Sequence, residues 1–439
     1  MPPGRAREIL VVGAGIAGLY AACRLVRAGH RVRIIEKADY AGGRLFTVHD
    51  MKQGWQYEAG GARFHAGHAR LSRLMAKLGV GRVPLPAGMQ HVPRQGSIRD
   101  IEVDAALASF CNADITQTGV VATAHESSEV DAAAVTALQQ EVGYDAEFNV
   151  SHVADCQRSV CNDLISKHPF FIVKEGYSAI IDRLVARLAK RGVAVELRAE
   201  LLEFGNTPAD PPRVRARVRK QTAGGEREEQ ENEYDDVILA IPPDAARAVT
   251  GFSEKIKDEW SRTLGSAPLM RIYAAWDAPT PWWAARAPRK TTVDRRRPGC
   301  EHIQFFIPLG HPRLAMASYS DGDTARWWQA RAEEDASGAS LRAHLTRELR
   351  AAFGEDIPEP AAVFPHYWPA GVHMFTPRPG PLAGVADRAL VRRWARPDPG
   401  ARVFVANEGF SYHHQWVEGS LESACRALRA LAAADPGGA

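Results

Sequence analysis

The feature that most constrains this chain is a set of three glycines placed directly after a short apolar run. Residues 9–12 read Ile-Leu-Val-Val, which is typical of a buried parallel strand, and Gly13, Gly15 and Gly18 follow in a G-x-G-x-x-G order. The first glycine allows a tight turn, the second lets a pyrophosphate approach the backbone, and the third lets a helix pack on the strand. The pattern therefore predicts a strand, a turn and a helix, with the helix N-terminus facing the phosphates of a dinucleotide.

A second strand and an acidic side chain extend this unit. Residues 32–35 read Val-Arg-Ile-Ile, and Glu36 follows them, 18 residues after Gly18 and near the ~20 expected for an acid that binds a ribose. Residues 42–44, Gly-Gly-Arg, offer a second phosphate clamp, because two glycines permit a close approach and an arginine can form two parallel bonds. A nicotinamide dehydrogenase does not need this second clamp. The alternative is a glycine-rich turn that binds nothing.

These motifs, together with Glu36-Lys37, resemble the flavin amine oxidase superfamily, which includes monoamine, polyamine and L-amino acid oxidases. The resemblance implies FAD as the cofactor. It also implies an α/β fold, with a Rossmann-type FAD-binding domain and an α+β substrate-binding domain that carries a helical insertion. The expected FAD-binding domain is discontinuous and comprises residues 1–83, 191–255 and 386–439, and the substrate-binding parts are residues 84–190 and 256–385.

Residues 60–63, Gly-Gly-Ala-Arg, resemble the superfamily segment that runs beside the flavin ring. L-Amino acid oxidases carry an arginine where Arg63 stands, and there it holds the substrate carboxylate, whereas monoamine and polyamine oxidases usually lack it. The role is physically sound, because a planar guanidinium can hold a carboxylate with two parallel bonds and so fix the α-carbon. The alternative is that Arg63 pairs with an internal acid such as Glu58.

The second half of the chain resembles the superfamily at further positions. The resemblance implies that backbone near Leu201 touches the adenine, that Ala240 ends a strand at the nucleotide, and that Glu408 binds the ribityl or phosphate region. Trp416 would form a wall of the substrate cage. The amide of Val417, at the start of the last helix, would stabilise the anionic reduced ring with the help of the helix dipole.

The chain departs from the superfamily pattern at two further positions of the expected site, Arg271 and Gln415. Arg271 stands where most amine oxidases carry a lysine that bonds through water to the flavin N5 atom. Arginine stays protonated and cannot relay a proton, although it could hold a water molecule or a carboxylate. Gln415 replaces the usual glycine, so we expect a narrower site there.

The sequence also bears on how the flavin is held and on partners. Val372 stands near the place where monoamine oxidases attach flavin through a cysteine, so the FAD is expected to be non-covalent. The net charge of +3 and the absence of an apolar run of about 18 residues argue against nucleic acid or a membrane as the main partner. The N-terminus has no apolar signal core, and the six cysteines form no C-x-x-C pair, which predicts free thiols and a cytoplasmic protein without a metal site. The pair His413-His414 alone does not suggest a metal, because adjacent side chains face apart.

The expected helical insertion contains three acids that could line a pocket for a cationic substrate, namely Asp100, Asp145 and Asp155. The alternative, solvated acids on helices and loops, is favoured for each of them. In the superfamily such an insertion covers the substrate site and sets the specificity for the side chain.

The motifs and the resemblance give each candidate site residue an expected role. Catalysis is assigned to Arg63, Arg271 and Trp416, and substrate binding to Arg63, His373, Gln415 and Trp416. Cofactor binding is assigned to Gly13, Gly15, Ile16, Ala17, Gly18, Glu36, Lys37, Gly42, Gly43, Arg44, Gly60, Gly61, Ala62, Arg63, Leu201, Ala240, Glu408, Trp416 and Val417.

The resulting hypothesis is an FAD-dependent L-amino acid oxidase. It would move a hydride from the substrate α-carbon to the flavin, give an imine and then a 2-oxo acid and ammonia, and reduce O2 to hydrogen peroxide. A homodimer is compatible with this hypothesis. One alternative is a monoamine or polyamine oxidase, which would leave Arg63 nothing to hold. The other is a non-catalytic flavin-binding protein with a degenerate site, which the departures at Arg271 and Gln415 motivate.

Overall fold

A computed structural model gives the architecture of the chain. It describes residues 6–86, 89, 110–111, 139, 144–164, 168–208, 212–222, 224–278, 280–293, 295, 297–378, 382 and 387–434. Asp100 and most of the expected insertion helices lie outside these residues. Among the described helices, none combines the length and the apolar character that a membrane crossing requires.

A five-stranded parallel sheet carries the glycine motif, in the order β18-β12-β1-β2-β8. Its strands come from three separate parts of the chain, namely β1 (Glu8–Val12), β2 (Arg31–Ile35), β8 (Val195–Glu196), β12 (Asp236–Leu239) and β18 (Val403–Val405). The predicted strand, turn and helix are therefore present, with α1 (Ile16–Arg27) directly after the glycine turn. The discontinuous course of the chain agrees with the Rossmann-type α/β fold, while the domain limits themselves stay predictions.

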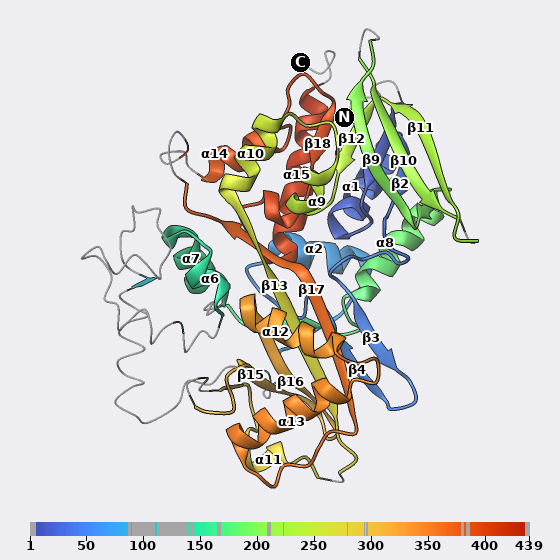
Figure 1. Cartoon of the computed structure of the whole chain (residues 1–439). Coiled ribbons are helices and arrows are strands. Elements are labelled where there is room, and N and C mark those ends of the chain that lie inside the picture. The colour runs from blue at the N-terminus through green and yellow to red at the C-terminus, as the bar shows by residue number, and fades with distance from the viewer. Residues whose placement is uncertain are drawn as a thin grey trace.

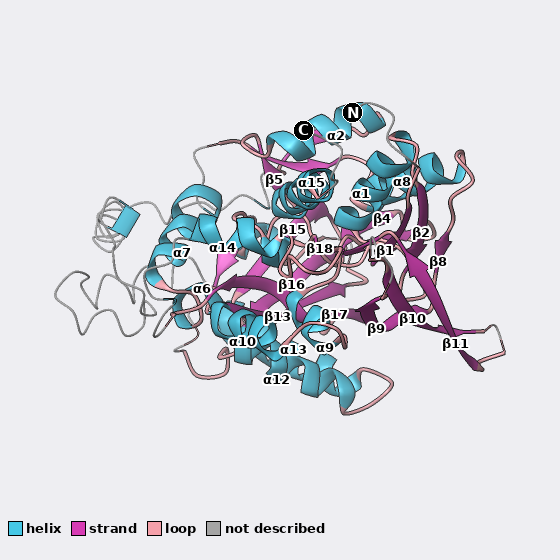
Figure 2. Cartoon of the chain, turned by 90° about the horizontal axis from the view of Figure 1, so that it is seen from above, coloured by secondary structure: helices cyan, strands magenta, loops and turns pink. Residues whose placement is uncertain are grey.

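Both faces of this sheet are covered. Apolar residues of α1, α8 (Ser178–Ala189) and α15 (Val417–Ala433) pack on one face, as Figure 2 shows from above. The other face packs against β9 (Ala199–Asn206), β10 (Val214–Gln221), α10 (Glu254–Thr263) and α14 (Asp387–Trp394). A strand buried on both faces must be apolar throughout, which explains why residues 9–12 show no polar alternation.

The basic run after residue 212 and the acidic run after residue 225 form the predicted hairpin. Strand β10 pairs antiparallel with β11 (Arg227–Tyr234), which places Arg215 opposite Glu233 and Arg219 opposite Glu229. The alternating arginines are thus paired with acids across the hairpin.

The second unit is built on an antiparallel sheet in the order β14-β15-β16-β13-β17. Its strands are β13 (Leu264–Ala275), β14 (Thr291–Thr292), β15 (Phe305–His311), β16 (Leu314–Asp321) and β17 (Ala362–Phe375). Figure 1 shows β13 and β17 leading from the region of α15 down to the part covered by α12 (Gly322–Glu333) and α13 (Ala339–Phe353). The start of β13 and the end of β17 therefore approach the nucleotide-binding unit.

The remaining described elements connect these two units. They are β3 (Thr47–Asp50), β4 (Trp55–Glu58), β5 (Phe64–His65), α2 (Ala69–Leu78), β6 (Arg82–Pro84), α6 (Ala146–Asn149), α7 (Val153–Arg158), a π-helical turn (Ser159–Leu164), β7 (Phe170–Val173), α9 (Pro243–Ala248), α11 (Trp283–Arg286) and a 3-10 turn (Glu408–Phe410). Strand β7 pairs with both β5 and β6, which fixes residues 60–63 at the edge of the nucleotide-binding unit.

The cysteines correct one expectation from the sequence. Cys111 and Cys161 form a disulfide, so not all six thiols are free. The two residues are 50 positions apart in the sequence. The disulfide also removes the argument that cysteine usage indicates a reducing compartment.

Candidate active site

A cavity of ≈ 420 Å³ lies where the glycine turn, the segment before β5, the antiparallel sheet and the start of α15 meet. The expected site residues that line it are Gly13, Gly15, Ile16, Ala17, Glu36, Gly42, Gly43, Arg44, Gly60, Gly61, Ala62, Arg63, Ala240, Arg271, Glu408, Gln415, Trp416 and Val417. Four expected residues do not line it, namely Gly18, Lys37, Leu201 and His373. The cavity thus collects residues from almost the whole length of the chain.

Each of the three motif positions favours glycine for a different physical reason. Gly13 has φ +100°, and a Cβ there would lie 2.5 Å from the carbonyl oxygen of Ala240. A Cβ on Gly18 would lie 2.0 Å from the carbonyl oxygen of Gly13, so this glycine serves the packing of helix on turn. A Cβ on Gly15 would meet no protein atom within 4 Å. Packing therefore explains Gly13 and Gly18, and the open space at Gly15 fits the phosphate approach that the motif predicts.

Glu36 is fixed at the end of β2 with its carboxylate at the cavity. One oxygen accepts from the amide of Ala14 at 2.8 Å and the other from the amide of Ala38 at 2.9 Å. A carboxylate has about four acceptor positions, so both oxygens can still accept from ribose hydroxyls. Its neighbour Lys37 is 75% exposed, forms an ion pair with Glu200 at 2.8 Å and does not line the cavity, contrary to expectation.

The contact of backbone near Leu201 with the adenine stays a prediction, and the structure shows where its side chain lies. Leu201 lies in the core between the parallel sheet and β9, where its side chain is 5% exposed. Because β9 packs this residue against the sheet, it does not line the cavity.

Arg44 and Glu408 form the polar centre of the nucleotide end. Arg44 pairs with Glu408 and donates to the carbonyl oxygen of Gly371 at 2.8 Å. Burial opposes the ionisation of Glu408, but Arg44 and His373 together hold the pKa of this carboxyl well below its usual range. Its second oxygen is buried and has no protein partner. A hydroxyl or amide of a bound flavin cofactor would satisfy this oxygen, so the residues fit such a group.

His373 corrects the expectation of a substrate contact. It is 1% exposed and its Nδ1 donates to Glu408 at 2.7 Å. A bulge in the pairing of β13 with β17 lies nearby, between Ala267 and Leu269, and His373 packs beneath Gly409 instead of lining the cavity. Its role is therefore to hold the carboxylate of Glu408 in place.

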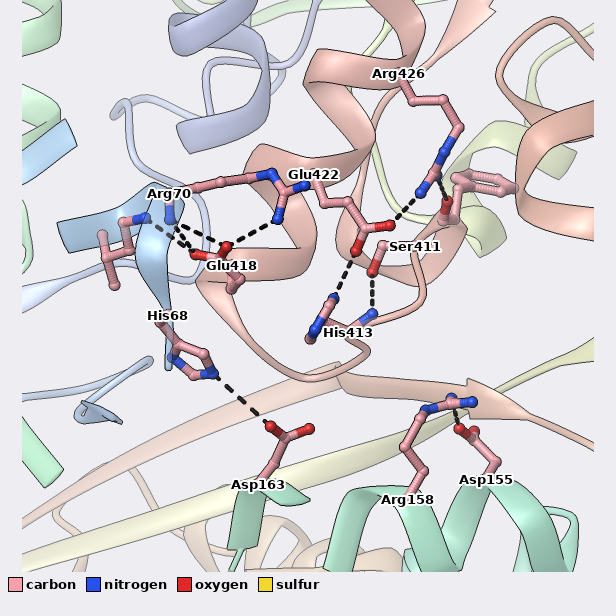
Figure 3. A network of polar contacts seen from close by, with 12 residues as sticks. His68, Arg70, Asp155, Arg158, Asp163, Ser411, His413, Glu418, Glu422 and Arg426 are labelled. Carbon is pink, nitrogen blue, oxygen red and sulfur yellow. Dashed lines mark hydrogen bonds and ion pairs between the residues drawn. The ribbon is translucent and has the colours of Figure 1, made fainter. Parts of the chain in front are cut away.

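The start of α15 faces the other end of the cavity. Trp416 is its N-cap in an extended conformation and gives no side-chain cap to the first turn, while Val417 and Ser420 line the cavity. Uncapped amides and the positive end of the helix dipole favour negative charge at this place. Glu418, in the first turn, points away and accepts from Arg70, as Figure 3 shows.

Arg63 lies just before β5 and lines the cavity. Its guanidinium carbon is 4.8 Å from the centre of the Phe170 ring, and it forms no ion pair within the described part of the chain. Glu58 does not pair with it. That carboxyl accepts from the hydroxyl of Thr47 and the amide of Tyr177, both at 2.9 Å, and burial raises its pKa to about 7. The cavity therefore contains a half-buried cation whose charge no acid of the described chain neutralises.

Arg271 is held more tightly. It is 7% exposed, its Nη1 donates to the carbonyl oxygen of Glu58 at 2.9 Å, and its guanidinium lies 4.7 Å from the centre of the Tyr319 ring. The hydroxyl of Tyr273 donates to the same carbonyl at 2.6 Å. Arg271 is therefore a fixed, permanent positive charge at the cavity wall.

The sequence did not point to several cavity residues. They are Tyr144, Glu147, Lys290, Tyr319 and Asp321. Of these, Glu147 is 3% exposed and Asp321 is 1% exposed. Glu147 stands between Ala146 and Phe148 in a short helix and carries no motif that would have singled it out.

The acids that the sequence did name have other partners. Asp145 forms a two-bond pair with Arg295, at 2.8 and 2.7 Å. Asp155 is buried, pairs with Arg158 and accepts from the amide of Phe375 at 2.7 Å. Neither lines the cavity, and neither is a solvated surface acid, so both interpretations from the sequence are wrong for these two residues.

A buried cluster of His65, His68 and Asp163 lies behind Trp416, and Figure 3 shows the last two facing each other. One ligand atom from each lies within 4.8 Å of the others, a spacing that could suit a metal ion. However, Nδ1 of His65 accepts from the amide of Gly67 at 3.1 Å, so Nε2 carries the proton and donates to Asp163 at 3.1 Å. That hydrogen bond, against the effect of burial, lowers the pKa of Asp163 to about 2. The arrangement is a hydrogen-bonded His–Asp pair.

Comparison with known proteins agrees with this geometry. A model for flavin containing amine oxidoreductase matches residues 127–432, and a model for an NAD(P)-binding Rossmann-like domain matches residues 11–78. An L-amino-acid oxidase of Mus musculus is 46% identical over 74 residues, which cover 17% of this chain and 12% of the mouse protein. An L-amino-acid oxidase of Bungarus fasciatus is 43% identical over 74 residues, which cover 17% of this chain and 14% of the snake protein.

The family model covers well over half of the chain, and the glycine turn, Glu36 and the start of α15 line one cavity. The chain belongs to the flavin-containing amine oxidoreductase family.

Proposed function

We propose that the protein is an FAD-dependent L-amino acid oxidase. The observation that carries this proposal is Arg63, a cavity cation that has no acidic partner among the described residues. A half-buried guanidinium with a free fork fits a ligand carboxylate, which accepts two parallel bonds from it. An amine without a carboxylate would leave this charge uncompensated.

The residues of the chain divide the work of such a reaction. Gly13, Gly15 and Glu36 would hold the diphosphate and ribose, while Arg44 and Glu408 would hold the middle of the cofactor. A bound flavin would supply the acceptor for a hydride from the substrate α-carbon and the route of its electrons to O2, with hydrogen peroxide as the product.

At the reacting end, Arg63 would orient the carboxylate and Trp416 would form one wall. The uncapped amides of α15 would stabilise negative charge that develops near its first turn. The reactive form of the substrate is the neutral amine, and the imine product would hydrolyse to a 2-oxo acid and ammonia.

Arg271 cannot relay a proton in this scheme. Its guanidinium is fixed by the carbonyl oxygen of Glu58 and stays charged, so its contribution is electrostatic. It can hold a water molecule or a carboxylate at the cavity wall. The same permanent charge also argues against the chain relying on a lysine-type proton transfer.

The cofactor is proposed to bind without a covalent link. Val372 lines the cavity near the position at which relatives with attached flavin carry a cysteine, and no cysteine stands among the described residues that line it.

The experiment compares each of the twenty L-amino acids with its decarboxylated amine in a peroxide assay on the purified holoenzyme. The proposal expects amino acids to be the better substrates by at least tenfold. A preference for amines would replace it with an amine oxidase, for which the buried carboxyl of Glu147 offers an ammonium site. Failure of every compound to bleach the flavin without oxygen would support a non-catalytic flavoprotein.

A further inference from the structure

The cavity contains two buried acids that the reaction outlined above does not use. Glu147 and Asp321 both line it, and they are 3% and 1% exposed. Neither has an ion pair within the described part of the chain. Buried carboxyl groups are normally paired with a cation, because leaving water is costly for a charge. This pair of acids therefore needs a separate explanation.

The burial of the Asp321 carboxylate is explained by hydrogen bonds from the protein itself. Its oxygens accept from the amides of Asp145 and Ala146, at 3.0 and 2.8 Å, and from the side-chain amide of Gln304 at 3.0 Å. These bonds attach the start of α6 to the end of β16. The acid is thus a structural acceptor with little capacity left.

Glu147 is different, because none of the side-chain hydrogen bonds and ion pairs found among the described residues involves its carboxyl, although Gln415 lies near enough to oppose the rise of its pKa. Burial, followed by the neighbouring Asp321, raises the pKa of Glu147 to about 8. An acid in this state ionises when a cation is placed beside it. Glu147 thus has acceptor capacity that faces the cavity and no protein group that uses it.

Gln415 gives an independent sign that this arrangement serves a ligand. Its φ is +69°, a conformation that glycine adopts freely and that strains a glutamine. The strained residue directly precedes Trp416 and lines the cavity, as Glu147 does. Strain that the surrounding structure maintains is typical of ligand-binding and active sites. A glutamine here brings a side-chain amide to the same cavity as Glu147, which a glycine could not provide.

Arg63 and Glu147 line the same cavity, and they favour ligand groups of opposite charge. Burial is the main reason that the pKa of the Tyr144 hydroxyl is raised. Arg63 lowers this pKa and Glu147 raises it. The tyrosine is therefore within electrostatic reach of both groups. Apolar side chains of Ile307 and Met316 line the cavity as well. A ligand with a carboxylate, an apolar stem and a cationic end matches this set of groups.

Lys290 also lines the cavity, but its charge is directed elsewhere. Its Nζ lies 3.8 Å from the centre of the Phe305 ring and 5.6 Å from the centre of the Tyr144 ring. No ion pair joins Lys290 to Glu147 among the described residues.

We propose that Glu147, which lines the cavity together with Gln415, receives the ammonium or guanidinium end of a basic L-amino acid whose carboxylate is held by Arg63. The inference rests on the proposed function and narrows its substrate class to arginine-like and lysine-like side chains.

The test compares L-arginine with L-citrulline, which has nearly the same shape but a neutral end. Two quantities are measured on the holoenzyme: kcat/KM from peroxide formation, and Kd without oxygen from the change in flavin absorbance. The wild type should prefer L-arginine by about 10- to 100-fold in both, the scale of one hydrogen-bonded charge in a buried site. L-Lysine against L-norleucine should show the same trend.

Three variants test which residues cause the preference for L-arginine over L-citrulline. Glu147→Gln keeps the shape of the acid and should reduce the arginine preference to within a few fold, mainly by weakening L-arginine. Gln415→Gly relieves the strain but removes the side-chain amide that shares the cavity with Glu147, and should lose part of the preference. Glu200→Gln is the matched control, because Glu200 pairs with Lys37 on the surface, and it should keep the full preference.

The outcomes separate this inference from the proposed function. Equal use of L-arginine and L-citrulline by the wild type overturns the inference and leaves an L-amino acid oxidase. Failure of both to bind overturns it too, as does a Glu147→Gln variant that keeps the preference. If the wild type prefers agmatine to L-arginine, and agmatine to N-carbamoylputrescine, the acid site is supported and the proposed function falls.

Discussion

Replacing Arg63 by alanine tests the choice of substrate class most directly. In the ligand-free protein the guanidinium contacts the Phe170 ring at 4.8 Å and makes no ion pair with the described residues, so folding depends on it only weakly. A cation–π contact at a half-exposed site is worth about 0.5–1 kcal/mol, and the free energy of unfolding should fall by no more than that. The variant should therefore fold and bind flavin.

The effect on substrate is much larger. Removing one partner of a buried two-bond ion pair costs roughly 3–5 kcal/mol, because the other charge is left uncompensated. At about 1.4 kcal/mol for each factor of ten, kcat/KM for amino acids should fall by ~10²–10³ or more. Arg63→Lys should recover little of this loss, since an ammonium cannot reproduce the planar fork.

The assay measures kcat/KM for one amino acid and its decarboxylated amine by peroxide formation, and the free energy of unfolding by urea denaturation. Arg82→Ala is the matched control: this guanidinium lies 4.3 Å from the centre of the Phe171 ring and does not line the cavity. It should cost similar stability and leave kcat/KM unchanged. If Arg63→Ala keeps the preference of the wild type for the amino acid over the amine, Arg63 does not hold the carboxylate and the reasoning is refuted.

Three further predictions follow from the cavity. Acid denaturation should release the flavin into the supernatant, and yellow colour that stays with the precipitated protein would contradict non-covalent binding. Glu36→Ala should weaken FAD binding by ~1–3 kcal/mol, measured as the Kd for FAD from flavin fluorescence, and an unchanged Kd would contradict the ribose contact. The ratio of Kd for L-citrulline to Kd for L-arginine should rise from pH 7 to pH 9 in the wild type and stay flat in Glu147→Gln. Burial chiefly raises the pKa of Glu147 to about 8, with Asp321 and Asp145 adding to the rise and Gln415 opposing it. Below that pH the carboxyl must lose a proton before it can pair with a guanidinium, which weakens the binding of L-arginine. A ratio that falls with pH would show that another group titrates.

Part of the candidate site could be predicted from the sequence, and part could not. The glycine turn, Glu36 and residues 60–63 were predicted at the cavity and lie there. Lys37 and His373 were assigned from their neighbours in the chain, but neither lines the cavity. The side chain of Lys37 is exposed and pairs with Glu200, and that of His373 is hydrogen-bonded to Glu408. Proximity in sequence does not determine which way a side chain points.

The sequence by itself determined the nucleotide-binding unit, because its contacts are local: β1, the glycine turn, α1 and β2 follow one another within about thirty residues and require only the right apolar pattern and small residues. It also determined the basic and acidic hairpin, whose strands are joined by a short turn. The tertiary structure alone decided the pairing of Cys111 with Cys161, the support of Glu408 by His373, and the meeting of Glu147 with Gln415. These contacts join parts of the chain that no local pattern connects, and burial shifts the pKa values of their acids only after the two units have packed together.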